Sequence, residues 1–147
     1  GLLPPAESEL ERVRQISDLS FVASTLHPIV TRIRMPHFFA APEAARCVFE
    51  AGCKAMLEYF QLSETRISDG PWWYGNSWSA MDASLYWVHW RVTGAGFSGE
   101  DYPAFNEHST RCEQRPAVQR ALAREQEAQL ALESQGLAFK PPPLSGS

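Results

Sequence analysis

Prolines stand at the ends of the helical segments in this chain and constrain its fold more than any other feature. Pro36 closes a long segment that begins near Glu7, and Pro42, Pro103 and Pro116 each open another. Proline suits the first position of a helix, because its missing N–H is not needed there, but it interrupts a helix interior. No stretch shows the period-2 alternation of apolar and polar residues that indicates a strand. The sequence therefore predicts an all-α fold, a helical bundle.

The same prolines, together with the glycines, predict where each helix begins and ends. We expect helices over residues 7–35, from 42 to a break at 63–71, from 79 to 94–96, over 103–114 and over 116–136. Pro28 falls inside the first helix and removes a backbone donor, so a kink is expected one turn earlier. The domain organisation that follows is a linker remnant at 1–6, a helical domain at 7–136 and an extended or disordered tail at 137–147.

Apolar residues at helical spacing predict which faces of the first two helices are buried. In the first helix they are Leu19, Val22, Leu26, Ile29 and Ile33. In the second helix they are Val48, Gly52, Ala55, Tyr59 and Leu62. We expect both sets to face the core of the bundle.

Ser79 and Asp82 have the spacing of a capping box at the start of the third helix. In such a box the Ser79 hydroxyl is expected to accept from the Asp82 backbone N–H, and the Asp82 carboxylate to accept from the Ser79 N–H. Three tryptophans, Trp72, Trp73 and Trp78, precede the box closely. A helix start shielded by so many aromatic rings is predicted to lie inside the bundle.

Composition and charge exclude several function classes. The 147 residues fit one domain, and 44% of them are hydrophobic. The formal net charge of −4 argues against a nucleic-acid partner, and no apolar run has the length of a membrane span. Three cysteines, an odd number without metal-ligand or redox spacing, favour free thiols in a reducing, cytoplasmic compartment. His108 and Cys112 supply only half of a metal site, so no metal is expected.

Several motifs occur together in an order that is typical of one family. They are "PWWYGNSWSAMDASLYW" at 71–87, Arg115-Pro116 with Val118, "LSFVASTLHPIVTRI" at 19–33 and "LLPPAESELERVRQ" at 2–15. The chain resembles the C-terminal helical domain of cytosolic glutathione transferases, in particular the bacterial beta-like members. Met81 departs from the pattern, since the family usually has alanine before the aspartate. The resemblance covers nearly the whole chain.

The resemblance implies a larger enzyme than this chain. The family's N-terminal thioredoxin-like domain binds glutathione, and that domain is absent from this sequence. The intact protein would be a cytoplasmic homodimer in detoxification, joining glutathione as co-substrate to a hydrophobic electrophile. This chain, which needs no cofactor of its own, would line the electrophile pocket and is expected to be inactive and not to bind glutathione when isolated. The identity of the electrophile is not encoded in these motifs.

The candidate site residues lie on the first and third helices. Ser20, Ser24, His27 and Thr31 form a narrow band of small or uncharged polar residues, unlike a solvated face rich in Lys and Glu. By resemblance this band lines the cleft between the two domains. His27 would lie near the glutathione sulfur as an auxiliary catalytic residue. Ser20 matches a position that contacts glutathione across the dimer in some members, where the longer asparagine is typical. Trp87 and Trp90 would wall the pocket for the electrophile.

Each of these residues also has a structural interpretation. His27 can serve simply to anchor the helix beside Pro28, and aromatic residues at helical spacing such as Trp87 and Trp90 are often core residues. The other histidines, His37, His89 and His108, are expected to be structural or solvated. The alternative for the whole chain is a non-catalytic, transferase-like assembly module whose polar first-helix face binds a protein partner.

Overall fold

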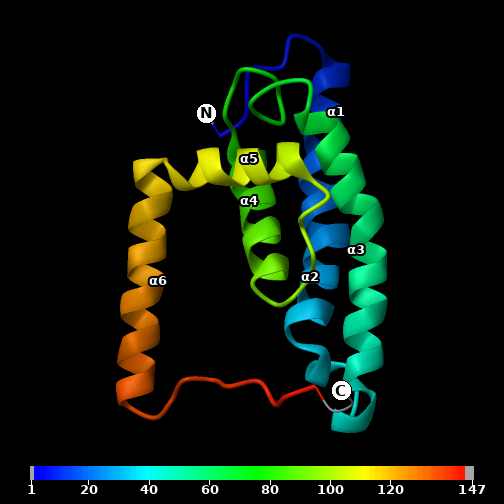
Figure 1. The fold of residues 1–147 in the computed structure, drawn as a ribbon. Helices are drawn as coiled ribbons and strands as arrows, with labels where there is room; N and C mark the ends of the chain where they lie inside the picture. The colour runs from blue at the N-terminus through cyan, green and yellow to red at the C-terminus, as the bar shows by residue number, and fades with distance from the viewer. Residues whose placement is uncertain (1, 145–147) are drawn as a thin grey trace.

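The computed structural model describes residues 2–144 and confirms an all-α fold (Figure 1). Its helices are α1 (Glu9–Phe21), α2 (His27–Arg34), α3 (Ala45–Ile67), α4 (Ala80–Thr93), α5 (Pro103–Glu113) and α6 (Pro116–Ser134). Among the described residues, β pairing is limited to two isolated bridges inside the loop at 72–77. The division into linker, helical domain and tail stays a prediction.

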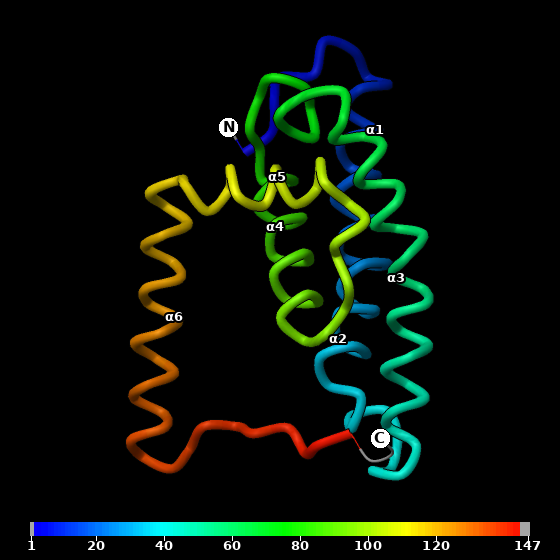
Figure 2. The backbone as a smooth tube through the Cα atoms, in the orientation of Figure 1, coloured from blue at the N-terminus to red at the C-terminus, as the bar shows by residue number. Residues whose placement is uncertain are grey.

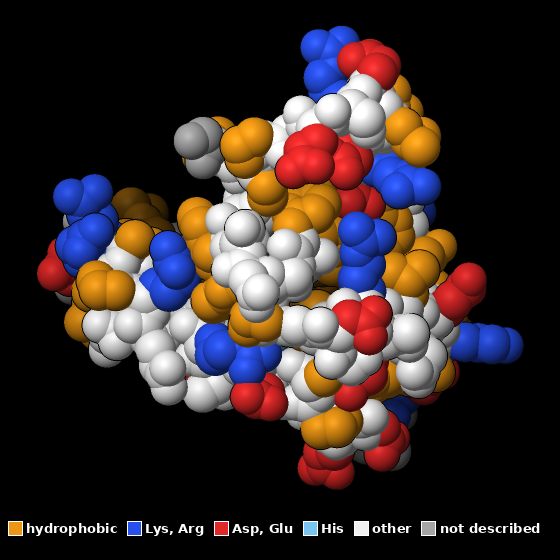
Figure 3. Space-filling model, turned by 90° about the horizontal axis from the view of Figure 1, so that it is seen from above, with side chains coloured by type: hydrophobic (Ala, Val, Ile, Leu, Met, Phe, Trp, Pro, Cys, Tyr) orange, Lys and Arg blue, Asp and Glu red, His pale blue; other side chains and the backbone are white. Residues whose placement is uncertain are grey.

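The helices form a bundle, and α6 extends along one side of it. α1 and α2 make one long helical run beside α3, with α4 packed against α2 and α5 crossing the end of α4 (Figure 1). α6 descends from the far end of α5, and the chain after it runs back to the foot of α2 and α3 (Figure 2). Seen from above, hydrophobic and charged side chains are interspersed over the exposed face (Figure 3). The bundle therefore has its core between α2, α3, α4 and α5, with α6 at its edge.

An aromatic cluster around Phe60 of α3 forms the centre of the core. The ring of Phe60 lies 4.6 Å from that of Phe97, 4.8 Å from that of Phe105 and 5.2 Å from that of Tyr102. All four side chains are buried. Tilted and edge-on aromatic pairs at these distances are favourable beyond the apolar area that they bury. The cluster joins α3 to α5 and to the loop that precedes it.

A π-helical turn, Val22–Leu26, joins α1 to α2 one turn before Pro28. The N–H of His27 donates to the carbonyl of Val22, five residues earlier. Since Pro28 has no N–H and its ring crowds the preceding turn, the backbone accommodates it by widening locally. The disturbance expected from the sequence thus takes the form of a π turn, and α1, π turn and α2 together span 9–34, close to the predicted 7–35.

Asp82 organises the buried start of α4. Its carboxylate accepts from the backbone N–H of Trp73 at 2.7 Å, the N–H of Ser79 at 2.8 Å and Nε2 of His108 at 3.0 Å. The Ser79 hydroxyl donates to the same carboxylate at 2.9 Å and accepts from the N–H of Met81 at 3.2 Å. Both Asp82 and Ser79 are buried, so the capping box lies inside the bundle as predicted.

A second carboxylate, Asp18 of α1, holds the same loop from outside. It accepts from the indole N–H of Trp73 and from the hydroxyl of Tyr74, each at 2.9 Å. Arg66 stacks over the Trp73 ring at 4.5 Å and lies 3.6 Å from the Asp18 carboxylate. Trp73 therefore ties the loop to α4 through its backbone and to α1 through its side chain.

Glu64 of α3 caps α5 across 40 residues of sequence. Its carboxylate oxygens accept from the backbone N–H groups of Ala104 at 2.9 Å and Phe105 at 2.8 Å. These N–H groups belong to the first turn of α5, where no intrahelical acceptor exists. The prediction that Pro103 opens a helix is confirmed, and the cap comes from a distant helix rather than from the preceding residue.

The predicted buried faces were wrong in part. On α3, Ala55 and Leu62 are exposed. The buried residues there are Ala45, Gly52, Met56, Phe60, Ser63 and Ile67. At Gly52 α3 lies close against α2, because a Cβ there would lie 3.0 Å from Cγ1 of Ile33. On the first helical run Leu19 is 37% exposed, while Leu26 and Ile33 are buried as predicted and Val30 joins them.

The face of α3 was misplaced because a polar residue, Ser63, belongs to the buried side and Leu62 to the outer one. The start of the helix also differs from the prediction: Pro42 opens a 3₁₀ turn, Pro42–Ala44, and the α-helix begins at Ala45. Apolar periodicity alone therefore could not set the rotation of α3.

Candidate functional site

An open, largely apolar groove follows the seam between the first helical run and α4. Its volume is about 470 Å³, and it is lined by Leu19, Val22, Ala23, His27, Ala83, Ser84 and Trp87. The π turn supplies two of these residues and places His27 directly after it. π turns recur at functional sites because they redirect side chains within a helix. Two of the residues singled out in the sequence, His27 and Trp87, meet here.

The His27 imidazole stacks face to face on the Trp87 indole. Their ring centroids are 5.0 Å apart and their planes differ by 8°. His27 is exposed and Trp87 is half-buried, so the indole forms the floor and the imidazole the rim. No hydrogen bond to either ring nitrogen of His27 forms within the described part of the chain. The stack fixes the plane of the imidazole and leaves its N–H edge available to a ligand.

The three hydroxyl residues of the predicted band bond to their own helix. Ser20 donates to the carbonyl of Ile16 at 2.9 Å, and Ser24 donates to that of Ser20 at 2.6 Å. Thr31 donates to the carbonyl of His27 at 3.0 Å. Each hydroxyl keeps lone pairs as acceptors, but its proton is committed. None of the three lines the groove, and Thr31 lies half-buried beyond it.

Trp90 lies in a second hollow, on the other side of Trp87. This hollow has a volume of about 270 Å³ between α4 and α6. Its lining consists of Trp78, Ala83, Tyr86, Trp87, Trp90, Ala117, Val118, Ala121, Leu122 and Glu125. Trp87 is therefore shared by both hollows, whereas Trp90 contacts only the second. The apolar face of α6 was not singled out in the sequence, although the spacing Ala117, Val118, Ala121 and Leu122 carries that signal.

Charged residues close the rim of the second hollow. Arg91 stacks over the Trp90 ring at 4.2 Å and donates to both carboxylate oxygens of Glu125, at 3.0 and 3.1 Å. The Tyr86 hydroxyl donates to Glu113 at 3.2 Å. Burial, with the nearby Glu113 carboxylate, raises the pKa of Tyr86 to about 12. Tyr86 is therefore a neutral donor in this region and not a base.

The remaining histidines bond to neighbours within the fold. His108 is buried against Asp82, and His89 lies 2.7 Å from Oδ1 of Asn106. Burial lowers the pKa of His89 below its ordinary value, although the bond to Asn106 opposes this. Nε2 of His37 lies 2.8 Å from the carbonyl of Pro142. Neither His89 nor His108 lies in a hollow, which agrees with a structural role.

Cys112 is buried beside His108 and Asp82 but is not poised for reaction. Its Sγ lies 3.9 Å from Nε2 of His108, the same nitrogen that bonds to Asp82. Burial and the Asp82 carboxylate raise the pKa of the Cys112 thiol to about 12, so the reactive thiolate is disfavoured. Within residues 2–144 no group of three or more His, Cys, Asp or Glu side chains is arranged to hold a metal ion.

Solved structures of bacterial glutathione transferases are similar to this chain, among them the following three. A sphingomonad glutathione S-transferase complexed with glutathione shares 27% identity over 84% of this chain, with a TM-score of 0.67. A glutathione transferase from Methylococcus capsulatus shares 27% over 85%, and the beta-class enzyme of Sphingomonas chungbukensis 26% over 84%, each with a TM-score of 0.69. The chain spans only 58–59% of the length of these structures.

These matches confirm the resemblance in fold, which is that of the helical C-terminal domain region of the beta-class enzymes. No protein-family model and no curated protein sequence matches the chain. In the described part of the chain, none of the helices combines the length and hydropathy needed to cross a lipid bilayer.

Proposed function

We propose that this chain, whose fold is that of the helical domain of bacterial glutathione transferases, forms the electrophile-facing wall of such a transferase. The observation that carries the proposal is the His27–Trp87 stack beside the open apolar groove. Glutathione would be held by a partner domain, since the similar enzymes are much longer than the match. A flat, hydrophobic electrophile would rest against Trp87 with its reactive carbon directed towards the sulfur.

The proposed reaction is a nucleophilic substitution or addition by the glutathione thiolate. The thiol gives its proton to solvent, and the sulfur forms a bond to the electrophilic carbon. In a substitution the leaving group departs with its electron pair; in an addition the π bond of the electrophile breaks, and its electron pair takes up a proton from solvent. Positioning of the two reactants is the main contribution of such a wall. His27 would donate a hydrogen bond to the thiolate from the edge that the stack leaves free. Ser20, Ser24 and Thr31 stay predicted flanking contacts, and Trp90 would contact a substrate that extends into the second hollow.

Nuclear magnetic resonance on this chain alone tests the groove. Titration with an electrophilic aryl halide should shift the indole N–H resonance of Trp87 most strongly, because the ring forms the floor of the groove. Trp87→Ala should abolish saturable binding, whereas Trp90→Phe, a change in the neighbouring hollow, should retain it. Glutathione alone should give no calorimetric titration. Binding that survives Trp87→Ala, or that Trp90→Phe removes, would place the ligand elsewhere.

The role of His27 is tested where glutathione is bound, in the intact transferase. His27→Ala should lower kcat/KM about tenfold, the effect of losing one hydrogen bond to a charged sulfur. His27→Gln, which keeps an N–H donor, should retain most of the activity. Equal loss in both variants would indicate that the ring stack, and not the donor, is what the reaction needs.

A second function, protein assembly, is favoured by an exposed apolar ridge on α1. Leu10, Val13 and Ile16 are 60%, 53% and 56% exposed, and they follow one another at intervals of three residues. A contact with a partner or with a second copy of the chain would cover this ridge. Ile16→Glu should then lower the oligomer mass in light scattering while leaving turnover per site unchanged. Unchanged mass would exclude the ridge as an interface.

A further inference from the structure

The segment after α6 folds back onto the foot of the bundle. Nε2 of His37 donates to the carbonyl of Pro142 at 2.8 Å, across 105 residues of sequence. The rings of Phe38 and Phe139 form a tilted pair with centroids 6.4 Å apart. Figure 1 shows the segment running from the end of α6 back towards the turn that follows α2. Two independent contacts thus join the tail to the turn that follows α2.

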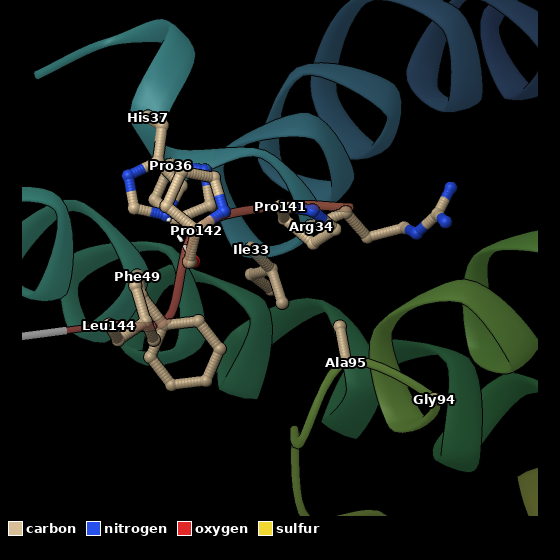
Figure 4. A pocket seen from close by; sticks show the side chains of 10 residues that line it. All are labelled: Ile33, Arg34, Pro36, His37, Phe49, Gly94, Ala95, Pro141, Pro142 and Leu144. Atoms are coloured by element: carbon tan, nitrogen blue, oxygen red, sulfur yellow. Dashed lines mark hydrogen bonds between the residues drawn. The ribbon is translucent and has the colours of Figure 1, made fainter. Parts of the chain in front are cut away.

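The docking point is a groove built from α2, α3 and the end of α4. Its walls come from Ile33, Arg34, Pro36, Phe49, Gly94 and Ala95. Figure 4 shows Pro142 at the edge of the His37 ring, with the hydrogen bond between them, and Arg34 directed away from that ring. Beside the tail the groove keeps a volume of about 240 Å³. Pro141, Pro142 and Leu144 line it from the tail side.

The tail segment that lies in this groove has the chemistry that apolar grooves of this kind recognise. Residues 141–143 are consecutive prolines, which hold the backbone in an extended polyproline II conformation. Such a segment loses little conformational entropy when it binds, and its carbonyls point outward without internal partners. A groove of aromatic and apolar side chains with one donor for a carbonyl is the usual receptor for it. Phe49, Pro36 and His37 provide these elements.

The backbone at the end of α6 turns the chain towards the groove. The N–H of Leu137 donates to the carbonyl of Leu132 at 2.9 Å, and that of Gly136 to Glu133 at 3.0 Å. With Gly136 at a φ of +68°, these bonds form a Schellman motif, which stops the helix and turns the chain sharply. The exit of the tail from α6 is therefore fixed locally and not left to a flexible linker.

α6 has little else to hold its far end. None of its residues is buried, and Leu130 and Leu132 in its last turns are 58% and 42% exposed. Its contacts with α4, among them the Arg91–Glu125 pair, belong to its first half. The docked tail therefore restrains the second half of α6.

We propose that the groove beside His37 is a recognition site for a proline-rich extended segment, that residues 139–144 fill it within the same chain, and that this docking holds the far half of α6 in place. The site is separate from the groove of the proposed transferase function and does not depend on it. Because α6 forms one wall of the second hollow, release of the tail would loosen that wall.

The test compares full-length variants by binding of a fluorescent peptide with the sequence of residues 138–144. Replacing Pro141, Pro142 and Pro143 with serine frees the groove, whereas Lys140→Ser serves as the matched tail control. The freed chain should bind the peptide at least about tenfold more tightly than the unaltered chain, where the attached tail competes at high effective concentration. His37→Ala in the freed chain should weaken that binding severalfold.

Hydrogen exchange supplies the second readout. Amides in the last two turns of α6 should exchange about tenfold faster in the serine variant than in Lys140→Ser, because only the first loses its docked tail. Amides of α3 and α4 should not change. Equal peptide binding by all variants, or equal exchange in α6, would overturn the proposal. A dimer with exchanged tails in light scattering would overturn docking within one chain.

Discussion

The start of α4 and the groove beside its middle differ in how their polar groups are used. At the start, Asp82 is fully buried and accepts four hydrogen bonds from Trp73, Ser79 and His108. In the groove one helical turn further on, His27 and Trp87 stack at the surface, and the imidazole edge bonds to nothing in the described chain. The hydrogen-bonding capacity of Asp82 is thus fully used inside the bundle, whereas the His27 imidazole is exposed and keeps a free hydrogen-bonding edge.

The two sites therefore differ in whether their polar groups stabilise the fold or can bind a ligand. A carboxylate whose lone pairs are all occupied by its own chain has no capacity left for a substrate, but its loss leaves several buried donors without a partner. An exposed ring pair contributes little to stability, yet it offers a flat apolar face and a free donor to a ligand. We therefore propose that Asp82 serves the architecture and that His27 with Trp87 serves the function, and variants at these residues test that division.

The largest effect is expected from Asp82→Ala. The change strands the N–H groups of Trp73 and Ser79 and the His108 ring in a dry environment, which should lower the free energy of unfolding by about 3–5 kcal/mol. Urea denaturation measures this loss. The control is Asp82→Asn, which keeps one acceptor oxygen and should lose less. A loss below about 1 kcal/mol for the alanine variant would show that water enters and that the site is not saturated.

The hydrogen bonds around Asp82 should also make the stability of the chain depend on pH in the acid range. Burial alone would raise the pKa of Asp82, but hydrogen bonds from His108, Trp73 and Ser79 outweigh it and hold the pKa below its ordinary value. A carboxyl with a lowered folded pKa contributes stability that is complete above about pH 4 and is lost as pH falls through the folded pKa. One such group adds at most about 1.4 kcal/mol per pH unit to the slope.

Unfolding free energies measured between neutral pH and about pH 2 check this expectation. Below pH 4 the unaltered chain should lose stability more steeply than Asp82→Asn, which carries no ionisable group at that position. Parallel curves for the two proteins would mean that Asp82 titrates alike in the folded and unfolded states, contrary to its burial and its donors.

A smaller loss of unfolding free energy is expected when Asp18 loses one of its donors. Trp73→Phe removes the indole N–H that donates to Asp18 but keeps an aromatic ring and the backbone bond to Asp82. The cost should be about 1 kcal/mol, because Asp18 is partly solvated and water replaces the lost donor. Tyr74→Phe, which removes the other 2.9 Å donor to Asp18, is the matched comparison. A cost near that of Asp82→Ala would place Asp18 in the same class as Asp82.

The smallest effect on stability is expected in the groove itself. His27→Ala exposes part of Trp87 but leaves no buried group without a partner, so the unfolding free energy should change by less than about 0.5 kcal/mol. Thermal unfolding of the chain measures this change. A loss above about 1 kcal/mol would make the His27–Trp87 stack an architectural feature and would break the division drawn here.

Local rules predicted most of the helices but not their rotation. Pro103, Pro116 and the Ser79–Asp82 box act within one turn, and the helices that they open begin where expected. The buried face of α3 was misplaced because it depends on what packs against it, namely Ile33 at Gly52 and the aromatic cluster at Phe60. The cap that Glu64 gives to α5 was missed for the same reason, since nothing near Pro103 points to a residue 40 positions earlier.

The candidate site divides along the same line. The sequence singled out His27, Trp87 and Trp90 but could not tell which two would meet. The π turn before Pro28 and the rotation of α4 bring His27 onto Trp87 and leave Trp90 facing α6. The docking of the proline-rich tail at His37 had no local signal, because its partner lies 105 residues away.

The all-α class, the starts of α4, α5 and α6 and the interior capping box could be predicted from the sequence, because each depends on hydrogen bonds and steric limits within a few consecutive residues. The buried faces of the helices, the carboxylates that hold the loop at 72–77 and the aromatic ring that meets His27 became known from the packing of the helices. Those outcomes depend on side chains from distant helices competing for the same space and the same donors, and no short stretch of sequence records that competition.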